Sequence, residues 1–249
     1  MNKLFPQMLE RPENEPVILG LVYWIGAFFL IPALLTFFFL GGRQPEYEVW
    51  IVIVYHVINF VVALLAYRTH LMDTFINVQI YTKEILSTAA ICAVVIVVLR
   101  ITLGEILWHT GNEFFFNISF ATLPTTEADF LFFPTGILDM QPIWGILCFC
   151  LMTPLTVSCL LYGCVFAPIC VKKPWVAYVV TIALTFVQKF MIFFCLHSFE
   201  EQMAQFWLQL PVHLVACWSY QKTDTIWTPI AVHMIANTVF CLHFLIIIL

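Results

Sequence analysis

The stretch Ile226-Trp-Thr-Pro-Ile-Ala-Val-His233-Met-Ile-Ala-Asn237 opens the last hydrophobic segment of the chain. Within it, His233 and Asn237 are four positions apart, so a helix places both side chains on one face. The segment is long enough to cross a bilayer, where polar side chains are costly unless they have partners. The His233–Asn237 pair is therefore a candidate functional site, and the rest of the chain must supply what faces it.

The composition predicts an all-α, polytopic helical membrane protein. Of 249 residues, 62% are hydrophobic and 10% are charged, whereas a soluble domain is about half apolar and about a quarter charged. The ten Lys and Arg residues form no basic patch, which argues against nucleic acid and leaves the lipid bilayer as the first partner. The nine Cys lie mostly in apolar runs without a CxxC pair, and this pattern favours buried packing over disulfides or metal ligands.

About seven segments are candidate transmembrane helices, each of which needs about 20 residues to cross. They run over 17–40, 49–67, 85–108, 144–169, 175–196, 204–218 and 227–249. The sixth is the shortest and contains Pro211 and His213, so it either crosses or re-enters the membrane. Residues 69–84, which mix Leu71 and Phe75 with polar residues, are predicted to form an interfacial amphipathic segment.

The basic residues predict the orientation of these segments. With seven crossings, all but one of the basic residues outside the spans fall on the side of the N-terminus, and only Arg43 falls on the other. Because Lys and Arg accumulate in cytoplasmic loops, we expect a cytoplasmic N-terminus and an outer C-terminus, in a bacterial cytoplasmic membrane. The residues on the cytoplasmic side are Lys3, Arg11, Arg68, Lys83, Lys172, Lys173 and Lys222.

Several polar side chains lie inside the predicted spans, and the commonest role of such a group is an interhelical hydrogen bond. They are His56, Arg100, Glu105, Lys189, His197, His213, His233, Asn237 and His243. Arg100 and Glu105 are too far apart around a helix to pair well with each other, so each is expected to meet another helix. Lys189 is a candidate partner for Glu105, which could instead lie at the outer interface. Two His residues on separate helices, His197 and His233, with Asn237 one turn after His233, could hold a metal or orient a water and an oxyanion, but hydrolysis still requires a general base.

Two spaced motifs carry a family resemblance. Phe193 and His197 form FxxxH, and His233 and Asn237 form HxxxN beginning 36 residues after His197. Together with the sequence from Tyr220 to His233, these motifs resemble the CPBP intramembrane proteases. This family includes CAAX-prenyl-protease-like and bacteriocin-processing (Abi) proteins. The resemblance implies that His197, His233 and Asn237 are retained catalytic positions and that Phe193 is their motif partner.

The resemblance also divides the chain. It covers roughly residues 142–245 and implies a CPBP-like four-helix transmembrane core over 138–249. Before this core, residues 1–16 form a polar cytoplasmic arm. Residues 17–137 hold the first three transmembrane helices, the interfacial segment and a long outer loop, and they carry no resemblance of their own.

The first family motif, EExxxR, is degenerate in this chain. Ser158 and Cys159 stand where the two Glu residues belong, and Gly163 stands where the Arg belongs. In the family a Glu is thought to activate water, which neither Ser nor Cys can do in its place. A nucleophilic Ser or Cys paired with His would need an orienting group that the sequence does not provide, and a buried Cys is inert. The candidate replacement carboxylates are Glu105, Glu200 and Glu201.

Counting along the helices raises a question of depth. At about 1.5 Å per residue, Ser158 lies roughly 20 Å from Lys172, whereas His233 lies only about 10–15 Å from its own cytoplasmic loop. A site that joined Ser158 to His233 would therefore require the last span to begin deeper or the helices to tilt and break.

We therefore expect a catalytically inactive member of the CPBP fold that acts as a scaffold, a partner-binding subunit or an immunity-type protein, with a membrane protein as its partner. One alternative is an active intramembrane protease that cleaves a CAAX or leader peptide with a relocated base. Another is a transporter or a subunit of a larger membrane complex. No cofactor is expected, since His197, His233 and an Asn without a carboxylate make a poor zinc site.

Overall fold

The computed structural model describes residues 17–31, 34, 45–110, 142–192 and 199–248. This part of the chain is helical and contains no strand, which confirms the predicted all-α class. The first elements are α1 (Val17–Ile25), which continues into the π-helix η1 (Gly26–Leu30), and the long helix α3 (Pro45–Thr110). The last three are α9 (Pro174–Ile192), α10 (Phe199–Thr223) and α11 (Trp227–Ile248).

Between α3 and α9 lies a single rod in which α-helical and π-helical turns alternate. Its pieces are α6 (Pro142–Ile146), η4 (Leu147–Met152), α7 (Thr153–Val157), η5 (Ser158–Phe166) and α8 (Ala167–Lys172). Each π-helical piece ends just before a proline, Pro154 or Pro168. Proline lacks the backbone N–H that would continue the α-helical ladder, and wider turns commonly form where that ladder is interrupted.

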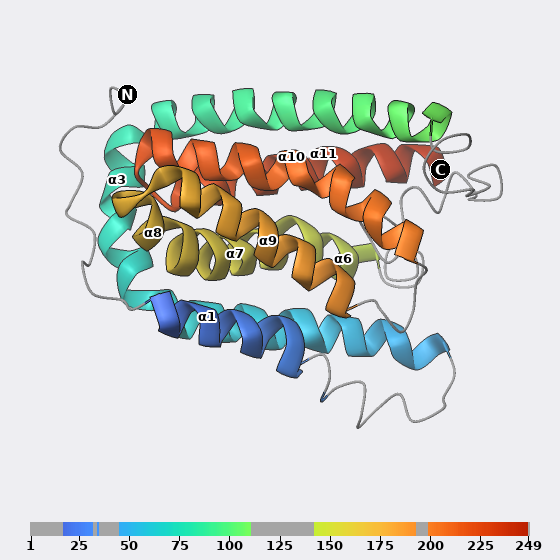
Figure 1. Cartoon of the computed structure of the whole chain (residues 1–249), viewed down its shortest axis with the longest axis horizontal. Helices are drawn as coiled ribbons and strands as arrows, with labels where there is room; N and C mark the ends of the chain where they lie inside the picture. The colour runs from blue at the N-terminus through green and yellow to red at the C-terminus, as the bar shows by residue number, and fades with distance from the viewer. Residues whose placement is uncertain (1–16, 32–33, 35–44, 111–141, 193–198, 249) are drawn as a thin grey trace.

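Helix α3 folds back on itself. Figure 1 shows a first arm along one edge of the bundle, an upright connector across one end, and a second arm that returns along the opposite edge. The backbone departs from helical geometry at Tyr81, with φ −114° and ψ 28°, where the second arm begins. Residues 69–84, predicted to be interfacial, thus form a helical connector between the two arms of α3.

The remaining helices fill the space between the arms of α3. Helices α10 and α11 both pack against α3 and against each other, α9 packs against α10, and α1 packs against η5. The α8–α9 turn and the α10–α11 turn lie at the same end as the α3 connector (Figure 1). The α10–α11 turn is tight because Asp224 adopts a left-handed conformation with φ 57°, which Asp tolerates better than most residues.

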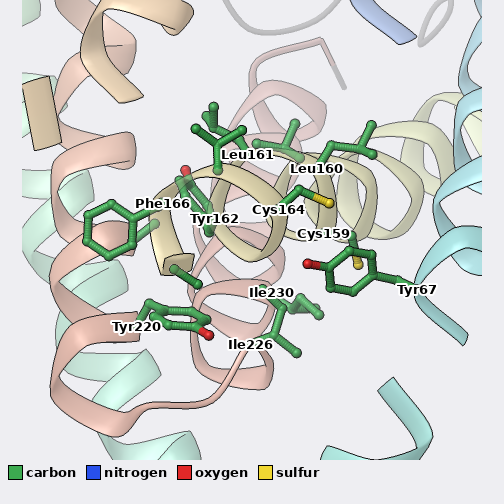
Figure 2. Close-up of a cluster of buried hydrophobic side chains, with 14 of the residues drawn as sticks. Tyr67, Cys159, Leu160, Leu161, Tyr162, Cys164, Phe166, Tyr220, Ile226 and Ile230 are labelled. Atoms are coloured by element: carbon green, nitrogen blue, oxygen red, sulfur yellow. The ribbon is translucent and has the colours of Figure 1, made fainter. Parts of the chain in front are cut away.

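The core is centred on η5. Its aromatic members Tyr162 and Phe166, together with Tyr220 of α10, are among the largest fully buried side chains (Figure 2). A second cluster uses mainly small residues, so the second arm of α3 can approach α10 and α11 closely. The residues of this second cluster are Ala89, Cys92, Ala93, Ile96, Val212, Val232 and Ala236.

Two helical stretches of the described residues are long and apolar enough to cross a membrane, Val78–Leu103 and Ile143–Lys172. Ile53–Arg68 and Pro174–Val187 are shorter apolar helices. The predicted sixth span, 204–218, lies inside the 25-residue helix α10. The full set of seven transmembrane helices and their orientation stay predictions.

Candidate functional site

The His233 side chain meets Tyr162 and His213 in a buried cluster, called here the Tyr–His cluster. The Tyr162 hydroxyl lies 2.8 Å from His213 Nδ1 and 3.1 Å from His233 Nε2. Tyr162 comes from η5, His213 from α10 and His233 from α11, and at most 6% of any of these side chains is exposed. Three separate helices are therefore tied together by one hydroxyl.

The chemistry of a hydroxyl assigns complementary roles to the two imidazoles. A tyrosine hydroxyl has one proton to donate and lone pairs to accept, so it donates to one ring nitrogen and accepts an N–H from the other. One of the two imidazoles therefore presents an N–H to Tyr162, and the other presents an unprotonated ring nitrogen. The two hydrogen bonds can thus form with both imidazoles neutral.

Position along the helices explains why Tyr162 rather than Ser158 reaches His233. Tyr162 lies four residues nearer than Ser158 to the end of the rod at Lys172. At about 1.5 Å per residue it is about 15 Å from that end, which agrees with the depth expected for His233. The depth mismatch anticipated for a Ser158–His233 site is thereby resolved, since a different residue makes the contact.

The residues at the degenerate EExxxR positions are all buried in η5. Ser158 and Cys159 are 0% exposed, and the Ser158 hydroxyl has no hydrogen-bond partner among the described residues. Gly163 packs directly against Tyr67 of α3: a Cβ at position 163 would lie 2.6 Å from the Tyr67 hydroxyl and 2.8 Å from two of its ring carbons. Figure 2 shows Tyr67 reaching from α3 toward Cys159.

The contact with Tyr67 leaves no room for the family's arginine. Cβ contacts below 3.0 Å force a neighbour to shift, and here the neighbour is an aromatic ring with 5% of its surface exposed. A side chain of any size at position 163 must displace that ring. The residue that packs against Gly163 thus comes from the N-terminal part of the chain, where the sequence shows no resemblance to the family.

Asn237 makes a different kind of contact from His233. Its Nδ2 donates a hydrogen bond of 2.8 Å to the backbone carbonyl of Phe149 in η4. In this π-helical turn the Thr153 N–H bonds to the Cys148 carbonyl, five residues back. By the same spacing, the backbone nitrogen of residue 154 would bond to the Phe149 carbonyl. Residue 154 is a proline, which has no N–H to donate. Asn237 thus satisfies a carbonyl that the proline leaves without its helical donor.

Arg100 lies buried on the second arm of α3, with 6% of its surface exposed. Its Nε donates a hydrogen bond of 3.1 Å to the carbonyl of Leu208 in α10. The Leu208 carbonyl lies next to a break in the helical hydrogen bonding of α10. The neighbouring Trp207 carbonyl has no α-helical N–H donor, because the residue four positions later is Pro211.

Several predicted site residues lie outside the described part of the structure. Phe193 and His197 fall in the undescribed segment 193–198. Glu105 lies on α3, and Glu200 and Glu201 lie on α10, but their side chains are not among those described. Their proposed roles as retained catalytic position, motif partner and replacement base stay predictions.

The described contacts of the His233 ring are with Tyr162 and His213. Its hydrogen-bond partner is the Tyr162 hydroxyl rather than a carboxylate. No group of three or more His, Cys, Asp or Glu side chains in the described part of the chain is placed to hold a metal ion. Within the part of the chain that the structure describes, the arrangement is a hydrogen-bond chain through Tyr162 that joins the two imidazoles.

Sequence reasoning missed Tyr162 and Tyr67, and it named His213 without joining it to His233. One available signal was symmetry about the α10–α11 turn. His213 precedes Thr223 by ten residues and His233 follows it by ten, so antiparallel helices bring them to one depth. No comparable signal marked Tyr162, whose contact depends on a π-helical turn.

The comparisons with known proteins agree with the motifs. No curated protein sequence and no solved structure matches the chain. A family model described as "Type II CAAX prenyl endopeptidase Rce1-like" matches residues 139–239. This family is integral to membranes, in agreement with the two apolar helices long enough to cross one. The matched region, which contains η4, η5, α10 and most of α11, confirms the predicted resemblance to the CAAX-protease-like family over that part of the chain.

Proposed function

We propose that this protein is a catalytically inactive, membrane-embedded relative of the Rce1-like endopeptidases that acts by binding a membrane-protein partner. The observation that carries the proposal is the Tyr162 hydroxyl bonded to both His213 and His233. In a hydrolase of this kind, His233 would assist a water activated by a carboxylate. Here its hydrogen-bonding nitrogen is already engaged by a side chain of the protein.

The chemistry of Tyr162 supports this proposal. A tyrosine hydroxyl keeps its proton up to about pH 10, so at neutral pH it is a hydrogen-bonding group and not a general base. Neither Ser158 nor Cys159 supplies a carboxylate, and an uncharged buried thiol is a poor nucleophile. The retained His then serves as an interhelical hydrogen-bonding group.

The packing of Gly163 adds an independent argument. An arginine at this position would place a charged guanidinium close to the site, but the Tyr67 ring lies against Gly163 instead. Loss of the two Glu residues alone would leave an empty polar site. Absence of the Glu residues, together with an aromatic ring packed against Gly163, supports the proposal that packing has replaced the site.

The direct test is cleavage by the purified full-length protein in detergent or vesicles. The substrates are a prenylated CAAX peptide and a leader peptide, with an active Rce1-like endopeptidase as the positive control. We expect no cleavage above that of the His233→Ala variant. Cleavage that disappears in folded His233→Ala protein would overturn the proposal, and Glu→Gln variants at positions 105, 200 and 201 would then identify the base.

The binding part of the proposal has its own test. The protein is solubilised from its native membrane in a mild detergent, and the co-purifying proteins are quantified. We expect a membrane protein in fixed stoichiometry. Purification as a single species without a stoichiometric partner would contradict the scaffold or subunit role, even if the protein proved inactive.

A further inference from the structure

The α3 connector presents an apolar face away from the bundle. Met72, Ile76 and Ile80 recur every four residues, so they form one stripe along the helix. They are 63%, 49% and 63% exposed, respectively, and Phe75 beside them is 45% exposed. Four large apolar side chains on one short connector exceed the scattered single residues that are normal on a protein surface.

The opposite face of the connector is fixed to the bundle. Leu71 is buried, and the Trp227 Nε1 donates a hydrogen bond of 3.2 Å to the Thr74 hydroxyl. Phe75 lies at the edge between the two faces: its ring meets the Trp227 ring edge to face at 5.5 Å, and 45% of its surface stays exposed. These contacts anchor the connector to the first turn of α11. The stripe is therefore held outward in a defined orientation and cannot fold into the core.

The neighbouring helices place this stripe at the edge of a bilayer. The apolar helix Ile53–Arg68 ends where the connector begins, and the candidate span Val78–Leu103 starts within it. Figure 1 shows the connector running across the end of both arms rather than along them. A helix that joins two membrane spans and crosses their ends lies in the plane of the interface.

The charges at this end of the bundle favour an anionic leaflet. Five basic side chains lie on or beside the connector and the two neighbouring turns, against three acidic ones, Asp73, Glu84 and Asp224. Trp175, at the start of α9 in the same region, is 69% exposed, as is typical of aromatic residues at the headgroup level. The basic residues are Arg68, Lys83, Lys172, Lys173 and Lys222.

We propose that the stripe formed by Met72, Phe75, Ile76 and Ile80 inserts into the boundary between headgroups and acyl chains of an anionic lipid leaflet. The basic residues around it then lie at the level of the phosphates. This makes the connector a lateral anchor that sets the depth of the bundle through α3 and, by the Thr74–Trp227 contact, the depth at which α11 begins. The proposal is independent of whether the Tyr–His cluster is catalytic.

The test uses the full-length protein in vesicles of phosphatidylcholine and phosphatidylglycerol. A nitroxide label is placed at Ile76→Cys and, as a matched control on the adjacent polar flank, at Asp73→Cys. Protein without an introduced cysteine, treated in parallel, gives the background from native thiols. Collision of each label with oxygen, which dissolves in lipid, and with a water-soluble nickel chelate is measured.

We expect the label at position 76 to collide preferentially with oxygen and the label at position 73 with the nickel chelate. Equal nickel access at both positions would place the stripe in water and overturn the proposal. An immobilised label at position 76 that neither reagent reaches would show that a protein, either a partner or a second copy, covers the stripe, and this also overturns it.

The lipid class is tested in a second set of vesicles. In phosphatidylcholine alone, or in the mixed vesicles with a Lys83→Gln, Lys222→Gln double substitution, we expect the oxygen preference at position 76 to fall. An unchanged preference in both conditions would overturn the requirement for an anionic leaflet. Circular dichroism of the double variant checks that the helices remain intact.

Discussion

The two π-helical turns of the α6–α8 rod both meet α11, but they do so in different ways. At η4, Asn237 bonds to the backbone carbonyl of Phe149, which Pro154 leaves without a helical donor. At η5, His233 bonds to the side chain of Tyr162. The first contact satisfies a backbone carbonyl, whatever side chain that residue carries. The second joins two side chains and therefore depends on both residue types.

This difference separates two reasons for retaining a motif residue. The Asn237 side chain satisfies a carbonyl that Pro154 cannot serve, and this role does not depend on catalysis. His233 is satisfied only while Tyr162 and His213 stand beside it. One residue of the HxxxN pair can therefore be explained by the backbone of the neighbouring helix, and the other by the side chains that it meets there.

The largest effect is expected at η5 from a substitution of Gly163. Gly163→Arg should prevent stable folding, and Gly163→Ala should destabilise the protein by about 1–3 kcal/mol because its Cβ collides with Tyr67. Thermal unfolding in detergent measures the loss. In a Tyr67→Ala background the added cost of Gly163→Ala should largely disappear, and an unchanged cost would show that the collision is not its cause.

Removal of the Asn237 side chain tests the contact at η4. Asn237→Leu should cost about 1–3 kcal/mol, since it leaves the Phe149 carbonyl buried without a partner. A Pro154→Ala substitution restores a backbone N–H at the position that serves this carbonyl. We therefore expect the Asn237→Leu penalty to be smaller in the Pro154→Ala background; simple additivity of the two changes would contradict the assignment.

A smaller effect is expected when the Tyr–His cluster loses its hydroxyl. Tyr162→Phe keeps the ring in place but removes both hydrogen bonds, at a cost of about 1 kcal/mol in a membrane bundle. The ring NMR signals of His213 and His233 should shift together, because one hydroxyl bonds to both. A shift at only one His would show that the cluster is not shared.

The smallest effect is expected at Thr153, which also lies beside η4. Its hydroxyl donates to the Cys148 carbonyl at 2.8 Å and lies 3.2 Å from His56 Nδ1. Since that carbonyl also accepts the Thr153 N–H, Thr153→Val should cost only about 0.5 kcal/mol. Thermal unfolding of the Thr153→Val and Asn237→Leu variants compares the two losses of stability. An equal loss would mean that the Cys148 and Phe149 carbonyls depend equally on side-chain donors.

Much of the fold follows from composition and hydrophobic segments. The apolar runs predict the helices, and the mixed segment 69–84 predicts the connector, because both depend on which residues prefer lipid, interface or water. The alternation of α and π turns in the rod is less accessible. Pro154 and Pro168 indicate that the ladder is interrupted, but not whether the helix kinks or widens.

The site could be predicted only in part for the same reason. His233 and Asn237 stand out as polar residues in an apolar segment, whereas Tyr162 looks like an ordinary aromatic core residue. A widened turn changes the direction of every side chain after it, so the residue types alone do not reveal that Tyr162 points toward His233. The role of Tyr67 is harder still to predict, because its side chain comes from α3, a helix far from Gly163 in the sequence.

The contact between Gly163 and Tyr67 also restricts the order in which substitutions could restore an EExxxR site. Arginine at position 163 is blocked while the tyrosine is present, and removal of the tyrosine alone leaves a cavity in the core. Each single step is therefore unfavourable, although the two together are compatible. A design that aims to restore hydrolysis has to begin on α3, outside the region that matches the family, before any catalytic residue is changed.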